Sequence, residues 1–129
     1  MLRVALHVRM PRDRVDSGRL GYLAITDRLP AGFEPVDTDL WTVASAPEIS
    51  EEHPFYDQLR WSSDSASHLE MRDDRVDLYF DRVWGSSVVA TYLVRATTPG
   101  EFRAPAPTAE LMYEPDSTGY GVSRRVVIK

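Results

Sequence analysis

Apolar side chains recur at every second position from the beginning of the chain. Leu2, Val4, Leu6, Val8 and Met10 alternate with other residues without a break. A period of two places such residues on one face of a β-strand, whereas a helix would distribute them around its axis. The chain therefore begins with a strand that presents one apolar face. Because this strand starts directly after the first residue, we expect the chain to be a piece of a larger protein.

Further apolar runs, each bounded by Pro, Gly or acidic residues, predict about seven strands in all. A hairpin is expected about 72–74, with Val76, Leu78 and Phe80 inward and Asp77 and Asp81 outward. The run 87–96 is apolar on both faces, as a central strand is. No segment has the pattern of a long amphipathic helix, so the sequence predicts an all-β fold, an antiparallel β-sandwich. The expected strands are 2–10, 20–27, 68–71, 75–81, 87–96, one beginning at 102, and 122–128.

Three segments between these strands are expected to consist mainly of turns and loops. Residues 29–35 contain two prolines and a glycine and predict a tight connection. Residues 37–66 are acidic and irregular, with a candidate strand at 41–44 and a candidate helical turn at 55–61, and the pattern assigns them no role. Residues 105–119 are expected to form a long loop that carries the apolar pair Met112 and Tyr113. This pair either contacts a partner surface or packs back on its own domain.

Size and composition limit the kind of protein. The chain has 129 residues, 43% of them hydrophobic and 27% charged, which is typical of one globular domain over 1–129. It has no cysteine, which excludes disulfides, thiolate metal ligands and thiol nucleophiles. No apolar stretch approaches the length of a membrane helix, so direct membrane insertion is not expected. The net charge of −5 and the dispersed basic residues argue against nucleic acid as a partner.

Residues suited to catalysis or metal binding occur without the spacing that such sites require. His7, His53 and His68 are too far apart in sequence to form a metal-binding motif. The acidic pairs 51–52 and 73–74 are typical of exposed turns, since adjacent carboxylates do not converge on one atom. No nucleophile elbow or phosphate-binding loop is present. We therefore expect no enzyme activity, no cofactor and no metal site.

The tryptophans Trp41, Trp61 and Trp84 leave a second class of function open. Exposed aromatic side chains on a β-sandwich can stack on sugars, although core or loop packing is the commoner use of a tryptophan. The alternative to a domain of a larger protein is therefore a free-standing β-sandwich module for adhesion or carbohydrate binding.

Four runs of residues, in this order and spacing, resemble the C-terminal domain of bacterial alpha-2-macroglobulins. The resemblance covers about residues 1–128, and four ordered runs are more specific than any one of them. The runs are Thr-Asp-Arg-Leu-Pro-Ala-Gly-Phe-Glu-Pro-Val at 26–36, Glu-Met-Arg-Asp-Asp-Arg-Val at 70–76, Tyr-Leu-Val-Arg-Ala-Thr-Thr-Pro-Gly-Glu-Phe at 92–102, and Ala-Glu-Leu-Met-Tyr-Glu-Pro at 109–115.

The resemblance implies a macroglobulin-like β-sandwich, a periplasmic or cell-envelope location, and a role in broad inhibition of proteases by trapping. In the family, a separate domain carries a Cys-x-Glu-Gln motif whose thioester captures the protease. Where the thioester is present, a Met-Tyr loop of the terminal domain covers it until the bait region is cleaved, and Met112 and Tyr113 match that loop. The implied partners are the thioester domain, other neighbouring domains of the parent chain and, through the intact protein, target proteases.

Overall fold

The computed structural model describes residues 1–11, 21–37, 66–83 and 86–129. Their regular structure consists of strands, all paired antiparallel, so the expected all-β fold is confirmed. Three of the strands lie where the sequence predicts a turn or a loop. The strands are β1 (Leu2–Arg9), β2 (Leu23–Arg28), β3 (Phe33–Val36), β4 (His68–Arg72), β5 (Arg75–Phe80), β6 (Ser87–Ala96), β7 (Gly100–Ala104), β8 (Thr108–Leu111), β9 (Glu114–Tyr120) and β10 (Arg124–Ile128).

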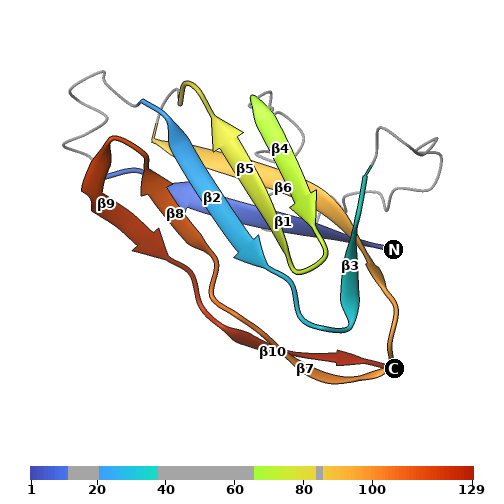
Figure 1. The fold of residues 1–129 in the computed structure, drawn as a ribbon. Coiled ribbons are helices and arrows are strands. Elements are labelled where there is room, and N and C mark those ends of the chain that lie inside the picture. Colours follow the sequence, from blue (N-terminus) through green and yellow to red (C-terminus); the bar gives the residue numbers. More distant parts are fainter. Residues whose placement is uncertain (12–20, 38–65, 84–85) are drawn as a thin grey trace.

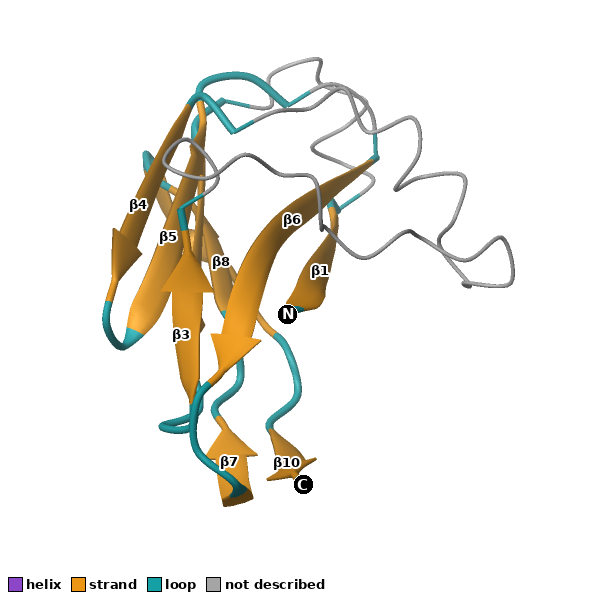
Figure 2. Cartoon of the chain, turned by 90° about the vertical axis from the view of Figure 1, so that its right-hand side faces the viewer, coloured by secondary structure: helices purple, strands orange, loops and turns teal. Residues whose placement is uncertain are grey.

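The strands form two layers and a short ribbon. A five-stranded sheet in the order β4-β5-β2-β8-β9 lies across a three-stranded sheet in the order β1-β6-β3 (Figure 1). The ribbon β10-β7 extends from one end of the two layers (Figure 2). The apolar core lies between the layers, where burial of these side chains supplies most of the driving force for folding. Its most buried members are Leu23, Ile25, Val76, Val88 and Val94.

Strand β1 has the orientation that its alternation predicts. Val4, Leu6 and Val8 pack against the core, and they pair in register with β6 residues that are themselves buried. Strand β6 is the middle strand of its sheet and is buried on both faces, with Val88 on the inner face and Leu93 on the outer. The expectation of a central strand at 87–96 is confirmed.

The hairpin of β4 and β5 is also confirmed, with its turn at residues 73–74. Val76, Leu78 and Phe80 point into the core and are at most 2% exposed. Asp77 lies on the opposite face, as expected, but it is buried there, with 6% of its surface exposed, while Asp81 is exposed. The alternation of apolar and polar residues predicts correctly the face of the sheet on which Asp77 lies. It does not show which other side chains cover that face.

The connection expected at 29–35 is in part a strand. A turn closes where the Phe33 N–H donates to the Pro30 carbonyl at 3.0 Å, and β3 begins at Phe33 and crosses to the other sheet. Pro35 lies within β3, where it pairs with Val94. Because β3 is at the edge of its sheet, a residue without an N–H is tolerated there.

Gly32 allows the ribbon to pack against this turn. A Cβ atom at Gly32 would lie 2.5 Å from the Phe102 ring of β7 and 2.8 Å from Ile128 of β10, far inside van der Waals contact. The Gly32 carbonyl accepts the Thr97 N–H at 2.9 Å, which ties the same turn to the end of β6. A larger residue at position 32 would require the Phe102 ring and the Ile128 side chain to move away from the turn.

One hydrogen bond joins the two sheets through the core. The Tyr92 hydroxyl on β6 donates to the Asp27 carboxylate on β2 at 2.5 Å, and both side chains are buried. Burial raises the pKa of Asp27, and the bond from Tyr92 opposes that rise only in part. Burial and the same bond raise the pKa of Tyr92, so its hydroxyl remains a donor. This contact fixes one point of β2 against one point of β6.

We predict that Tyr92→Phe lowers the free energy of unfolding by about 1–3 kcal/mol, because a buried acceptor loses its donor. Urea unfolding of the chain at pH 7 measures this change. The matched control is Tyr120→Phe, since Tyr120 is 76% exposed on β9 and its substitution should change stability by less than about 0.5 kcal/mol. Equal effects of the two substitutions would contradict a stabilising role for the cross-sheet bond.

We also predict that Asp27→Asn alters how stability depends on pH. The folded state holds the Asp27 proton more tightly than the unfolded chain, whose carboxyl has its ordinary pKa of 3.8. The stability that this group contributes is therefore present below pH 3.8 and is lost as the pH rises through the raised folded pKa. Because Asn does not ionise, the variant should gain stability relative to the wild type over that interval and hold the gain above it. Urea unfolding at intervals from pH 3 to pH 8 measures the difference, and a constant difference would disprove the assignment.

Candidate functional site

The segment 105–119 is a hairpin and not the long irregular loop that the sequence suggested. Strands β8 and β9 pair antiparallel at the edge of the five-stranded sheet, and Met112 and Tyr113 form the two-residue turn between them (Figure 1). The sequence does not reveal β8 because this strand is short, with four residues, and because it also pairs with β2, which is distant in the chain. The pair Met112 and Tyr113 is thus held at the tip of a hairpin.

Two backbone features hold this turn in place. The Met112 N–H donates to the Tyr22 carbonyl at 2.9 Å, which extends the pairing of β8 with β2 by one step. Leu111, just before the turn, is 6% exposed and belongs to the core. The turn is therefore attached to the centre of the sheet on one side, while its own side chains are free to face outward.

The side chains of the turn are exposed. Met112 is 48% exposed and Tyr113 is 77% exposed. The Tyr113 ring meets the Tyr22 ring edge to face, with centroids 5.3 Å apart and planes at 78°. Tyr22 is itself 46% exposed. We call these three residues, Tyr22, Met112 and Tyr113, the tip patch. Three neighbouring exposed side chains of this kind make the tip patch a candidate contact surface.

Tyr22 is the member of the tip patch that the sequence did not point to. It falls within the strand expected at 20–27, and the structure places it just before β2 begins. The sequence shows an aromatic residue near the start of a strand. It does not show that this residue contacts a residue of another hairpin. Of the two uses that the sequence left open for Met112 and Tyr113, the exposure of both favours contact with a partner surface.

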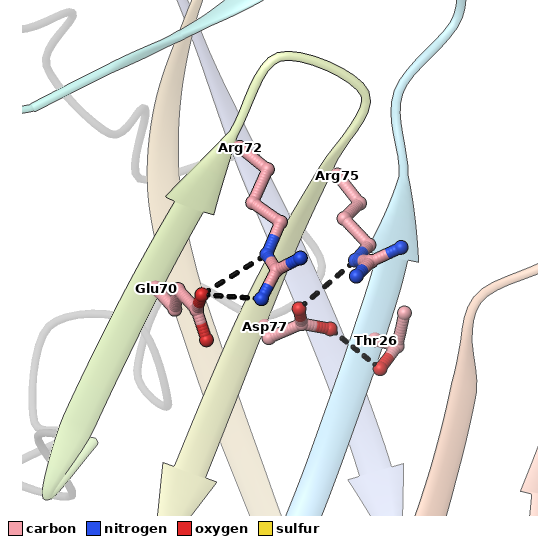
Figure 3. A network of polar contacts seen from close by, with 5 residues as sticks. All are labelled: Thr26, Glu70, Arg72, Arg75 and Asp77. Atoms are coloured by element: carbon pink, nitrogen blue, oxygen red, sulfur yellow. Dashed lines mark hydrogen bonds and ion pairs between the residues drawn. The ribbon is translucent and has the colours of Figure 1, made fainter.

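Polar and charged side chains on the outer face of the same sheet form hydrogen bonds and ion pairs with one another (Figure 3). Asp77 accepts from the Thr26 hydroxyl at 2.7 Å and, on its other oxygen, from Arg75 Nε at 3.1 Å. Arg72 donates from two nitrogens to Glu70 Oε1, at 3.0 and 2.6 Å. These bonds explain why a carboxylate can be buried on this face, since both of its oxygens have donors. The bond from Thr26 to Asp77 joins β2 to β5, whereas the bond from Arg72 to Glu70 lies within β4 and the bond from Arg75 to Asp77 lies within β5.

The histidines do not form a site within the part of the chain that the structure describes. His7 lies on β1 of one sheet and His68 on β4 of the other, where its ring stacks on Tyr79 with centroids 5.9 Å apart. His53 and all three tryptophans lie outside the described residues. Among residues 1–11, 21–37, 66–83 and 86–129, no group of three or more potential ligands could hold a metal ion. The same residues include no helix with the length and hydrophobicity needed to cross a bilayer.

A groove of about 580 Å³ opens between β1 and the segments around β8, β9 and β10. Its lining is largely aliphatic and includes Leu6, Ile25 and Val126. The Asp27 carboxylate also lines the groove, but it is already bonded to Tyr92. The exposed aromatic and apolar residues of the β8–β9 turn remain the stronger candidate for function.

The sequence of the chain matches a known family. A family model described as the bacterial alpha-2-macroglobulin MG10 domain matches residues 1–116. The alpha-2-macroglobulin of Escherichia coli strain K12 is 33% identical over 112 residues, which cover 81% of this chain and 6% of the relative. The alpha-2-macroglobulin of Xylella fastidiosa strain Temecula1 is 32% identical over 97 residues, which cover 75% of this chain and 6% of the relative. The chain thus spans 6% of the length of these relatives.

Solved structures agree with the sequence comparison. Escherichia coli alpha-2-macroglobulin activated by porcine elastase is 27% identical, with a TM-score of 0.70 over 97% of this chain and 10% of that one. Salmonella alpha-2-macroglobulin reacted with methylamine is 27% identical, with a TM-score of 0.65 over 97% of this chain and 7% of that one. In both, the matching region is one part of a much longer chain. From these matches, the chain belongs to the bacterial alpha-2-macroglobulin family and is a macroglobulin domain of such a protein.

Proposed function

We propose that residues 1–129 form one non-enzymatic domain of a protease-trapping alpha-2-macroglobulin, and that the Met112–Tyr113 turn covers the thioester of a neighbouring domain. The observation that carries this proposal is the tip patch. A hairpin anchored in the core presents Met112 and Tyr113 to the outside. By the resemblance of the sequence to the family, these two residues correspond to its Met-Tyr loop. The chain has no cysteine, so the thioester itself belongs to another part of the parent protein.

The chemistry of a thioester explains what such a cover has to do. Water or an amine attacks the acyl carbon, forms a bond to it, and releases the sulfur as a free thiol. A covering group has to keep water away until the target is captured, so it should be large and mostly apolar. The Tyr113 ring has this character, and its hydroxyl can find a hydrogen bond at the domain boundary. Met112, which is unbranched and flexible, can fill the remaining space.

The solved structures of the relatives support this proposal. The Salmonella relative has been obtained after reaction with methylamine, a primary amine of the kind that opens thioesters. The Escherichia coli relative has been obtained after activation by porcine elastase and by trypsin. Amine reactivity and protease activation are the two properties that a bait-triggered thioester trap requires. By the same reasoning, we propose that target proteases meet this domain only through the intact protein.

The remaining partners and the location follow from the family. Homologous domains lie within a larger chain, so the partners we propose for this domain are its neighbours in that chain, the thioester domain above all. A trap for foreign proteases is useful at the periplasm or cell envelope, which is the location we propose. The net charge of −5 also gives this domain no general attraction to nucleic acid.

The proposal predicts that Tyr113→Ala in the parent protein speeds the reaction of the thioester with methylamine by about tenfold or more, since losing a covering contact worth about 1.4 kcal/mol corresponds to a factor of ten. The release of free thiol over time measures the rate. Because Tyr113 is 77% exposed, its truncation should leave this domain folded. The control is Tyr120→Ala, which removes a tyrosine of nearly equal exposure, 76%, from the same hairpin away from the turn. Equal rates for wild type and Tyr113→Ala would exclude the covering role.

A further inference from the structure

The tip patch contains a residue whose role the covering function does not by itself explain. Tyr22 directly precedes β2, the middle strand of the five-stranded sheet, and it lies at the same end of the sheet as the β8–β9 turn (Figure 1). It contacts the turn twice. Its carbonyl accepts the Met112 N–H at 2.9 Å, and its ring packs edge to face against Tyr113.

The conformation of the turn and the exposure of Tyr113 leave few contacts that restrict the orientation of the Tyr113 ring. Two-residue hairpin turns are most regular when one or both central residues have positive φ, yet Met112 and Tyr113 both have negative φ. The pairing of β8 with β9 also shifts in register between Glu110 and Leu111, as at a β-bulge. Because 77% of Tyr113 is exposed, little of the domain surface is available to restrict its ring.

We propose that Tyr22 is a positioning residue for Tyr113, which holds the ring of the cover in the orientation that meets the neighbouring domain. This inference rests on the proposed function and adds to it a residue from a different strand. Tyr22 sits at the start of a strand whose inner face belongs to the core, through Leu23 and Ile25, so its own position is well determined. The ring of Tyr22 restricts by steric contact the orientations that the Tyr113 ring can adopt.

The ring contact can be separated from the backbone contact by choice of substitution. Every residue at position 22 retains the carbonyl that accepts from Met112, so side-chain substitutions test the ring alone. Tyr22→Phe keeps the ring and removes the hydroxyl, whereas Tyr22→Leu removes the ring but keeps an apolar side chain. An edge-to-face aromatic pair contributes an amount that corresponds to about two- to tenfold in an equilibrium constant. The expected change in the rate of thioester opening has the same size.

The experiment measures thiol release from the parent protein after methylamine is added. Four variants are compared with the wild type: Tyr22→Leu, Tyr22→Phe, Tyr113→Ala, and Tyr22→Leu combined with Tyr113→Ala. The thioester content of each protein is measured first, as the thiol released in full reaction. We expect Tyr22→Leu to react about two- to tenfold faster than wild type and Tyr22→Phe to react like wild type. We expect the double variant to react no faster than Tyr113→Ala. If Tyr22 acts only by orienting the Tyr113 ring, its substitution has no further effect when that ring is absent.

The outcomes separate this inference from the proposed function. If Tyr113→Ala reacts like wild type, the covering role is excluded and the role of Tyr22 with it. If Tyr113→Ala reacts faster but Tyr22→Leu does not, the cover stands and the positioning role is overturned. If Tyr22→Leu accelerates the reaction further in the Tyr113→Ala background, Tyr22 acts independently of Tyr113, and the positioning role is again overturned. Faster reaction of Tyr22→Phe would assign the effect to the hydroxyl and overturn the ring contact as its cause.

Discussion

The hydrogen bond from Tyr92 to Asp27 fixes one point at which the two sheets meet. Apolar side chains attract without direction, so a core made only of Val, Leu and Ile allows small shifts between layers. A buried carboxylate and hydroxyl are costly unless they meet, and they meet only in one relative position of β2 and β6. This bond therefore defines the place of β2, and β2 in turn pairs with β5 on one side and with β8 on the other.

The tip patch depends on this placement. Strand β2 carries the core residues Leu23 and Ile25, and Tyr22 just before them reaches the β8–β9 turn. Leu111 is buried opposite Leu23, so the last residue before the turn is fixed while the next two residues project outward. A hairpin whose backbone is already paired with the sheet has less to order on binding, which lowers the entropic cost of contact with another domain. The fold thus provides both the anchor and the exposed surface that a cover requires.

Several elements could be predicted from their residues alone. The alternation in β1, the Asp-rich turn between β4 and β5, and the two-sided apolar run of β6 are local signals, and each predicted the correct element. The short strands β3 and β8 were not predicted because prolines are typical of loops. Pro35 lies within β3, and two prolines lie just before β8. Both strands exist because a partner from elsewhere in the chain supplies their hydrogen bonds: β6 for the first and β2 for the second.

By itself, the sequence determined the all-β class, the inward faces of the main strands, the likeness to one family, and the pair Met112 and Tyr113 as the residues to examine. Only the tertiary structure decided that this pair forms a hairpin tip, that Tyr22 meets Tyr113, and that Tyr92 meets Asp27. The physical reason is the range of the interactions. Alternation and turn chemistry act between neighbours in the chain, whereas these contacts join strands distant in sequence whose register is set by packing of the whole core.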